Sequence, residues 1–342
     1  MLLRYPAPLK PGDTIGVTSP SSGVKESLQG RLDAAVKVLL DRGYKVELGS
    51  CMDGSTHISA PAKERSAELM RMLLDPAIKA IIPPWGGETA IDVIPHLDFA
   101  AIATAQPTWF IGYSDISTLL TPLTLMTGVA TLHGTNLMDT PYEVPEPLMS
   151  WLDILSLPAG ATFLQATPGV YRVNDWDDWV NFPAITTHTW NGHGTWDRLD
   201  AGQGAVDVTG RLIGGCIETL VNLAGTPYLD TRTLGEDPAE PLIVYIEASG
   251  DDAATICRNL HGMRLAGFFD RAAAVLVGRT GAPDSPTLSQ TEAVLDALAV
   301  LGVPIIGNVE CGHVPPQLPI VNGAPGRIVF DGDNHFLEQT LR

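Results

Sequence analysis

The feature of this sequence that most constrains its fold is an alternation of short β-branched segments and amphipathic helical segments. Residues 14–19 (TIGVTS) favour a strand, and apolar side chains then recur at helical spacing from Val24 to Leu40 until Gly43 ends the pattern. The same order repeats in segments 44–48, 62–75, 78–84, 108–112, a helical stretch that begins near Asp115, and 129–134. Strands that alternate with helices predict an α/β fold with a parallel sheet covered on both faces, here a flavodoxin-like N-terminal domain.

The pattern changes after about residue 140 and returns after about residue 205. Five of the seven tryptophans lie in 141–205, and its segment 183–204 has neither helical nor strand spacing. So long a loop is usually functional or disordered, and its aromatic residues argue against disorder. We therefore expect a domain at 1–140, a linker with an active-site loop at 141–205, and a C-terminal α/β domain at 206–342. In the last, strands are expected at 242–247, 272–278 and 304–309, helices at 253–265 and 289–301, and the active site between the two domains.

Composition excludes several classes of function. The 342 residues carry a formal charge of -18, which would repel nucleic acid and anionic lipid, so we expect no nucleic-acid or membrane partner. No apolar run is long enough to span a bilayer, and prolines interrupt the N-terminal stretch where a signal peptide needs an apolar region. The four cysteines are widely spread, which favours a reduced, cytoplasmic setting. His188 and His193 lack flanking carboxylates or cysteines, so we expect no metal and no cofactor.

The tetrapeptide Gly112-Tyr113-Ser114-Asp115 lies where an apolar strand is expected to end and a helix to begin. A sharp turn at such a junction pushes the serine hydroxyl out of the sheet, and the N–H groups that open the helix, that of Asp115 among them, can bind an oxyanion. The usual second glycine is missing, because Ile116 stands two residues after the serine. The pattern leaves two alternatives for Ser114, a nucleophile and a helix cap.

A nucleophilic serine needs a base, and the base needs a carboxylate to orient it. His313 follows an expected strand at the edge where sites of open α/β sheets gather, and His133 is its rival. Glu247 closes the apolar segment 242–247, where an unpaired charge would be costly. Asp139 is the second candidate for the carboxylate.

The loop Trp85-Gly86-Gly87-Glu88 also follows an expected strand. Gly86 and Gly87 allow the backbone to approach a ligand closely, as an oxyanion donor must. We expect Trp85 and Glu88 beside them to contact substrate. An ordinary glycine-containing turn is the alternative.

Seven motifs, taken in order, are similar to those of the LD-carboxypeptidase family, and the resemblance covers roughly residues 10–330. It implies a serine carboxypeptidase or amidase with a triad of Ser114, Glu247 and His313. It also implies an oxyanion hole from the Gly86-Gly87 loop and the backbone N–H of Asp115, no metal, and a homodimer. The motifs are GDTIGVTSPSS, PPWGGE leading into IDVIPHLDF, FIGYSD, LHG, LIGGCIETL, the strand end at Glu247, and CGHVPPQLPIVNG.

Two branches of that family cleave different amides. Muramoyl-tetrapeptide LD-carboxypeptidases remove the terminal D-alanine from cytoplasmic cell-wall peptides, and microcin-C self-immunity proteases cleave between an aminoacyl group and a nucleotide-like moiety. The sequence looks more like the second branch, because of its long tryptophan-bearing loop and the run Ala-Ser-Gly-Asp-Asp after Glu247. We expect Trp190, and next Trp196, to stack on a nucleobase, although either could instead pack the loop onto the body. The expected substrate is a small peptide or an aminoacyl-nucleotide conjugate, with cell-wall recycling as the alternative.

Overall fold

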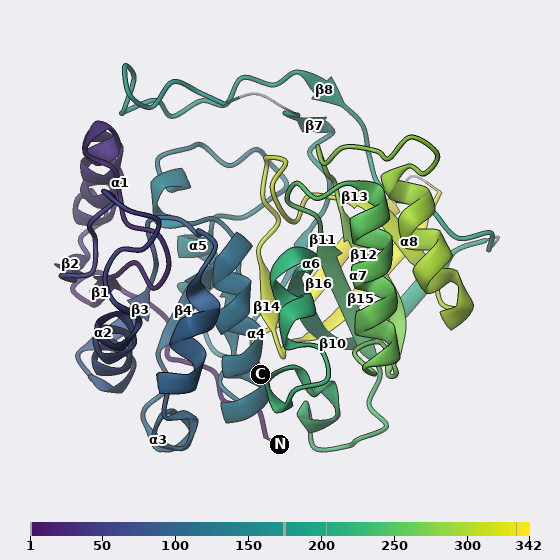
Figure 1. Ribbon diagram of the computed structural model, residues 1–342, viewed down its shortest axis with the longest axis horizontal. Helices are drawn as coiled ribbons and strands as arrows, with labels where there is room; N and C mark the ends of the chain where they lie inside the picture. The colour runs from purple at the N-terminus through teal and green to yellow at the C-terminus, as the bar shows by residue number, and fades with distance from the viewer. Residues whose placement is uncertain (1, 174–175, 203, 333) are drawn as a thin grey trace.

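The computed structural model describes residues 2–173, 176–202, 204–332 and 334–342. Two large sheets lie side by side, each with helices packed against it (Figure 1). The first sheet contains the N-terminal strands and the second contains most of the C-terminal ones. This is the mixed α/β architecture with parallel strands that the alternating pattern predicts.

The first sheet has six strands in the order β14-β5-β4-β3-β1-β2. The order β2-β1-β3-β4-β5 is that of a flavodoxin-like sheet, and these five strands are parallel. The sixth strand, β14, comes from the C-terminal part of the chain and pairs antiparallel with β5. The strands are β1 (Thr14–Val17), β2 (Lys45–Leu48), β3 (Ile78–Ile81), β4 (Trp109–Gly112), β5 (Thr131–His133) and β14 (Ile320–Asn322).

The helices of the first half follow the predicted apolar stripes. In α1 the buried face includes Leu32, Ala35 and Leu39, and Gly43 follows the helix with φ 85°. The helix starts later than the stripe indicates, because Val24 still forms a β-bridge with Asp53. The helices are α1 (Gln29–Asp41), α2 (Ala62–Leu74), α3 (Phe99–Thr104), α4 (Ser117–Thr127) and α5 (Trp151–Leu155).

The second sheet has eight strands in the order β6-β16-β15-β10-β11-β12-β13-β9. Its centre, β10 to β13, is parallel, and its outer strands are antiparallel. Asp252 caps α7, whose bounds are those that the sequence predicts. The strands are β6 (Thr162–Gln165), β9 (Asp197–Arg198), β10 (Val206–Cys216), β11 (Leu242–Glu247), β12 (Ala272–Gly278), β13 (Ile305–Val309), β15 (Pro325–Asp331) and β16 (Asn334–Thr340); the helices are α6 (Ile217–Leu220), α7 (Ala253–Leu265) and α8 (Gln290–Leu298).

The middle segment of the chain adds strands to the second sheet. β6 pairs with β16 at one edge, and β9 pairs with β13 at the other. Between them β7 (Val170–Tyr171) and β8 (Gly192–His193) pair with each other at the top of the molecule in Figure 1. The chain therefore leaves after β7 and returns at β8 at one place, where these two strands pair.

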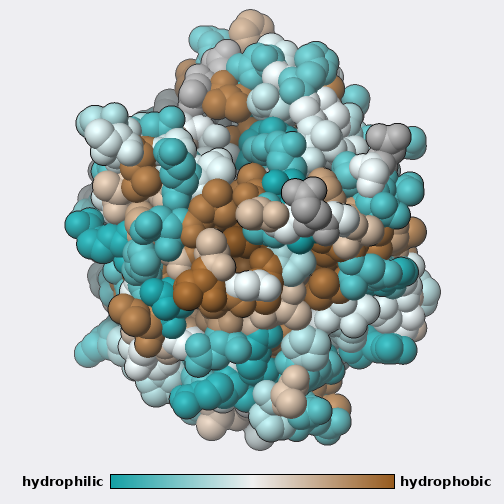
Figure 2. All heavy atoms as spheres, turned by 90° about the vertical axis from the view of Figure 1, so that its right-hand side faces the viewer, coloured by the Kyte–Doolittle hydropathy of each residue, from teal (hydrophilic) through white to brown (hydrophobic). Residues whose placement is uncertain are grey.

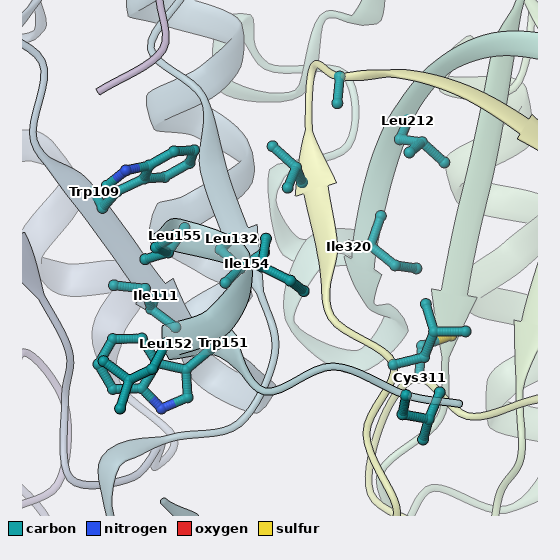
Figure 3. Close-up of a cluster of buried hydrophobic side chains, with 14 of the residues drawn as sticks. Trp109, Ile111, Leu132, Trp151, Leu152, Ile154, Leu155, Leu212, Cys311 and Ile320 are labelled. Carbon is teal, nitrogen blue, oxygen red and sulfur yellow. The ribbon is translucent and has the colours of Figure 1, made fainter. Parts of the chain in front are cut away.

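A shared hydrophobic core joins the two sheets. Trp109 and Ile111 of β4 and Leu132 of β5 pack with residues of α5 on one side, while Ile320 and Leu212 continue the cluster toward the second sheet (Figure 3). Burial of this apolar surface holds the sheets in one arrangement, so loops from both can meet. Among the described residues, the structure holds no helix with the length and apolar character needed to cross a membrane.

Candidate functional site

Ser114 occupies a strained turn at the carboxyl end of β4. Its φ of 61° lies in the left-handed region, which costs a residue with a side chain on the order of 1–3 kcal/mol. Gly112 permits the turn, because a Cβ there would lie 2.8 Å from Asn136 Oδ1 and 2.9 Å from Ile116 Cγ2. The serine opens a 3₁₀ turn, Ser114–Ile116, that leads directly into α4. The strand, turn and helix that the sequence predicts are all present.

His313 connects the serine to the second sheet. Its Nε2 lies 2.9 Å from Ser114 Oγ, and its Nδ1 lies 2.7 Å from Glu247 Oε2. Glu247 ends β11 and His313 lies in the loop after β13, so the three side chains come from the carboxyl ends of three parallel strands. The structure thus brings together the three residues that the sequence singled out for a triad.

The carboxylate of Glu247 controls the charge of His313. Burial by itself would lower the pKa of the imidazole, but the negative charge and the hydrogen bond of Glu247 outweigh it and raise that pKa above its ordinary value of 6.5. Glu247 is fully buried, and its Oε1 has no hydrogen-bond partner among the described residues. Such a carboxylate favours a protonated histidine, which a general base becomes during the reaction.

The rival histidine, His133, has a different environment. It is fully buried between the rings of Tyr113 and Tyr245, and neither of its ring nitrogens has a partner in the described part of the chain. Burial, and next the charge of His313, lowers its pKa to about 3. His133 thus stays neutral and makes no hydrogen bond to the serine.

Asp139, the rival carboxylate, lies in a different place from Glu247. It lines a cavity next to His313 but makes no hydrogen bond to it in the described residues. Burial raises its pKa to about 6, although Arg31 and Arg172 oppose that rise. The structure therefore offers His313 one bonded carboxylate, Glu247.

Gly86 lies against the serine turn. A Cβ added there would sit 3.1 Å from the backbone nitrogen of Asp115 and 3.2 Å from Ser114 Oγ. Among the described residues, the N–H groups of Gly86 and Gly87 donate no hydrogen bond. The space beside the serine hydroxyl is therefore bordered by backbone N–H groups from two loops.

The side chain of Asp115 has a structural task. It is buried and accepts hydrogen bonds from Ser21 Oγ at 2.5 Å and from the N–H of Ala90 at 2.8 Å. These bonds tie the serine turn to the loops after β1 and β3. The contribution to an oxyanion hole that the sequence suggests for Asp115 rests on its backbone N–H.

The two neighbours of the glycine pair differ in position. The indole N–H of Trp85 donates to the backbone carbonyls of Ser22 and Gly23, at 3.2 and 2.9 Å, and so anchors the loop. Glu88 is exposed at the surface. These positions give Trp85 a role in holding the loop, and they leave substrate contact by either residue as a prediction.

A cavity of about 540 Å³ lies next to His313. Its wall comes from the segment 139–153, from the loop 313–319, and from Arg172, Trp176, Thr186 and His188, so the middle of the chain forms much of it. Its polar and aromatic lining includes Tyr113, Asp139, Tyr142, Arg172, Trp176, His188 and His313. The sequence predicted an active-site role for the tryptophan-bearing segment, but Arg172 and Trp176 carried no signal that set them apart from their neighbours.

The tryptophans proposed for stacking do not line this cavity. Trp196 is 1% exposed and its indole N–H donates to Glu310 Oε2 at 2.6 Å, which matches the packing alternative. Trp190 is half-buried, with its ring 4.9 Å from that of His188. Trp176 is 67% exposed and does line the cavity. Trp151 also lines the cavity but is only 2% exposed, so Trp176 is by far the more exposed of these two tryptophans.

A stack of rings fixes the segment that carries these residues. His188 stacks on Tyr142 at 3.6 Å, and the guanidinium of Arg31 lies 4.6 Å from the centre of the same tyrosine ring. Burial, and next the charge of Arg172, lowers the pKa of His188 to about 4, so it packs as a neutral ring. His193, which we paired with His188 as a weak metal signal, lies in β8 and is exposed.

One group within the described residues has the donor atoms for a metal ion. Cys257 and His261 of α7 and Asp296 of α8 place a ligand atom each within 4.8 Å of one another. Arg264 donates a hydrogen bond to His261 Nδ1, which puts a cation beside the group. The group is on the surface of α7 and α8 and is separate from the serine site.

Two family models match the chain. One describes the LD-carboxypeptidase N-terminal domain and matches residues 15–134, and the other describes the LD-carboxypeptidase C-terminal domain and matches residues 209–328. The first match contains Ser114 and the glycine loop. The second contains Glu247 and His313.

Similar proteins and structures span nearly the whole chain. The microcin C7 self-immunity protein MccF of Escherichia coli is 29% identical over 96% of this chain and 94% of its own length. A protein of Bacillus subtilis named "Probable murein peptide carboxypeptidase" is 26% identical over 94% of this chain and 91% of its own length. The structure of MccF with aspartyl sulfamoyl adenosine superimposes with a TM-score of 0.81 at 26% identity, covering 100% of this chain and 99% of that one.

Proposed function

The chain belongs to the LD-carboxypeptidase family, and from this premise we propose that it hydrolyses an amide through Ser114 as nucleophile. The observation that carries the proposal is the position of His313, with one ring nitrogen on Ser114 Oγ and the other on Glu247. That geometry is the one a serine needs in order to lose its proton as it attacks a carbonyl.

The reaction follows from these contacts. Ser114 Oγ attacks the amide carbon while His313 Nε2 accepts the hydroxyl proton, and Glu247 stabilises the resulting imidazolium. The imidazolium then gives that proton to the amide nitrogen, the C–N bond breaks, and the amine leaves an acyl-enzyme. Water, deprotonated by the same histidine, attacks the ester and restores the serine.

We propose that the oxyanion is held by backbone N–H groups of the Gly86-Gly87 loop and of Asp115. The proposal is supported by the close approach of Gly86 to the serine and by the free N–H groups of the glycine pair within the described chain. Donors that are already fixed in place stabilise a developing charge without reorganisation.

The substrate that we propose is an aminoacyl-nucleotide amide of the kind bound by MccF. Support comes from the sequence identity to MccF over most of both chains and from the exposed ring of Trp176 in the cavity. An amide that ends in D-alanine is the second candidate, because the Bacillus subtilis relative carries a murein peptide name.

A single comparison tests the function. Purified protein and its Ser114→Ala variant are given aspartyl sulfamoyl adenosine and a murein tetrapeptide, and free amino acid or D-alanine is measured. We expect the unaltered protein to cleave the nucleotide amide faster, and the variant to cleave neither. Hydrolysis that persists in the variant at the original rate would remove Ser114 from the mechanism.

We also propose a cytoplasmic homodimer. All four cysteines are free, which suits a reducing compartment. Apolar side chains gather across the middle of the face at the right-hand end of Figure 1 (Figure 2). Large exposed apolar residues of the chain include Leu265 and Val300, near the ends of α7 and α8. Sedimentation equilibrium measures the mass in solution, and a monomer at all concentrations would contradict the dimer.

A further inference from the structure

An arginine without a full set of partners borders the cavity beside His313. Arg172 is 3% exposed and pairs with the carboxylate of Asp177. Its Nε is buried and has no hydrogen-bond partner in the described part of the chain. A guanidinium carries five N–H donors, and leaving them unmade in a buried site is costly. The side chain is therefore held ready for a further acceptor.

Asp177 does not reserve its carboxylate for this arginine, because several groups donate hydrogen bonds to it. Tyr142 donates its hydroxyl to Asp177 Oδ2 at 2.6 Å, and Thr189 donates to Oδ1 at 3.3 Å. Asp139 lines the same cavity, and burial raises its pKa to about 6, so it takes up a proton at a higher pH than an ordinary aspartate. In a chain with a net charge of -18, Arg172 is a buried cation at the wall of this cavity.

The position of His313 indicates which part of a substrate would enter the cavity. The imidazolium must reach the nitrogen of the departing amine, so the leaving fragment lies on the histidine side of the serine. The cavity is bordered by His313 and Tyr113 on that side. Arg172 is held there by its own backbone N–H, which donates to Pro315 in the histidine loop at 3.0 Å.

We propose that Arg172 binds the anionic group of the leaving fragment and so selects amides whose amine carries a negative charge close to its nitrogen. The proposal rests on the proposed function. A terminal D-alanine carries a carboxylate at this position, and a nucleotide phosphoramidate carries a phosphoryl oxygen there. A planar guanidinium fits either anion with paired hydrogen bonds. Arg172 is then a specificity-determining residue for both classes of substrate.

The first test measures selectivity between matched substrates. L-lysyl-D-alanine is compared with L-lysyl-D-alaninamide, and an aminoacyl phosphoramidate of adenosine with the corresponding neutral 5′-amide. We expect Arg172→Gln to lower kcat/KM for the anionic member of a pair by roughly 10- to 100-fold, the effect of losing a charged hydrogen bond, and to change the neutral member little. The loss should fall mainly on KM, because the triad is intact.

A matched control separates binding from structure. Asp177→Asn removes the ion pair but leaves the guanidinium, so it should keep the preference for the anion. Arg172→Lys retains the positive charge without the planar guanidinium. It should therefore show part of the preference for the anionic substrate that Arg172→Gln loses. Equal preference in Arg172→Gln and the unaltered protein would overturn the proposal. So would a loss of preference in Asp177→Asn as large as in Arg172→Gln.

The second test does not depend on turnover. Ser114→Ala and Ser114→Ala/Arg172→Gln are titrated by calorimetry with both dipeptides, and with adenosine monophosphate against adenosine. We expect the single variant to prefer the charged probes and the double variant to lose that preference. If only the dipeptide pair loses its difference in affinity in the double variant, the anion that Arg172 binds is a carboxylate. If only the nucleotide pair does, the anion is a phosphate. Equal affinity of the single variant for charged and neutral probes refutes the proposal, whereas binding through Arg172 without any hydrolysis refutes only the proposed function.

Discussion

Two histidines of this chain show how environment decides what a residue can do. His133 ends strand β5 and His313 lies in the loop after β13, and two such similar places are why the sequence left them as rivals. His313 has a buried carboxylate on one side and a serine on the other, whereas His133 lies among rings with no polar partner in the described chain. The carboxylate of Glu247 raises the pKa of His313, whereas burial lowers the pKa of His133. No spacing in the sequence reveals this difference, because it arises from residues 66 positions apart.

A double-mutant cycle tests whether the serine and the histidine act as one unit. Ser114→Ala and His313→Ala should each lower kcat by on the order of 10⁴, and the double variant should lose little more, because removing one member already stops proton transfer. His133→Ala is the matched control, and we expect its main effect on thermal stability or KM. If the two losses multiply in the double variant, the residues act separately.

The pH dependence of the reaction rate tests the ion pair between His313 and Glu247. A general base works in its neutral form, so the rate falls as the pH drops through the pKa of His313, and the raised pKa places that fall above pH 6.5. Glu247→Gln removes the charge that raises the pKa while burial still lowers it. We expect the acidic limb of kcat/KM to move to lower pH and the maximal rate to fall. If the acidic limb of kcat/KM stays at the same pH in Glu247→Gln, Glu247 does not set the pKa of His313.

At the scale of elements, local pattern predicted what local contacts determine. The helix expected at 253–265 is α7 with the same bounds, and Gly112 with Ser114 indicated the turn after β4. The strand β14 was not predicted, because three residues owe their conformation to pairing with β5, almost two hundred positions earlier. The hydrogen-bond partner of Trp196 could not be predicted for the same reason, because Glu310 lies 114 positions away. Long-range contacts leave no periodic trace in a sequence.

The proposed role of the Gly86-Gly87 loop in binding the oxyanion can be tested with Gly86→Ala, which adds one methyl group. In Gly86→Ala the new Cβ would stand 3.1 Å from both the Asp115 nitrogen and Ser114 Cβ, in the space that an oxyanion would need. We expect kcat to fall by roughly 10²–10³, as for the loss of one oxyanion donor, with little change in melting temperature. Gly12→Ala is a poor comparison because its φ is positive, so Gly250→Ala, with open space around it, is the control. Full activity in Gly86→Ala would place the oxyanion elsewhere.

At the scale of the molecule, the site exists because two sheets share one core. Ser114 and the glycine loop come from the first sheet, Glu247 and His313 from the second, and the cavity wall from the segment between them. The sequence predicted an active site between two α/β halves, and the bond between His313 and Ser114 lies at that junction. The sequence could not predict which side chains of the middle segment face the cavity, because that segment has an irregular backbone without a repeating period.

A nucleobase bound in the cavity would stack on the exposed ring of Trp176. Stacking on an aromatic ring is worth about 1–3 kcal/mol, so Trp176→Ala should raise KM for an aminoacyl sulfamoyl adenosine by roughly ten- to a hundredfold. Because this side chain is 67% exposed, its loss should cost little stability. Trp196→Ala, by contrast, should lower the free energy of unfolding by about 3–5 kcal/mol, as expected for a fully buried ring.

The control substrate for this prediction is an L,D-linked peptide, which has no base to stack. Its hydrolysis should respond to Ser114→Ala but not to Trp176→Ala, since the hydrogen bonds that join Ser114, His313 and Glu247 do not involve that ring. Trp190→Ala gives a matched comparison, because that ring packs against His188 and does not line the cavity. Should the peptide be the faster substrate and the nucleotide amide ignore both tryptophans, the cell-wall branch would describe this enzyme and the aromatic stack would serve only to hold the loop.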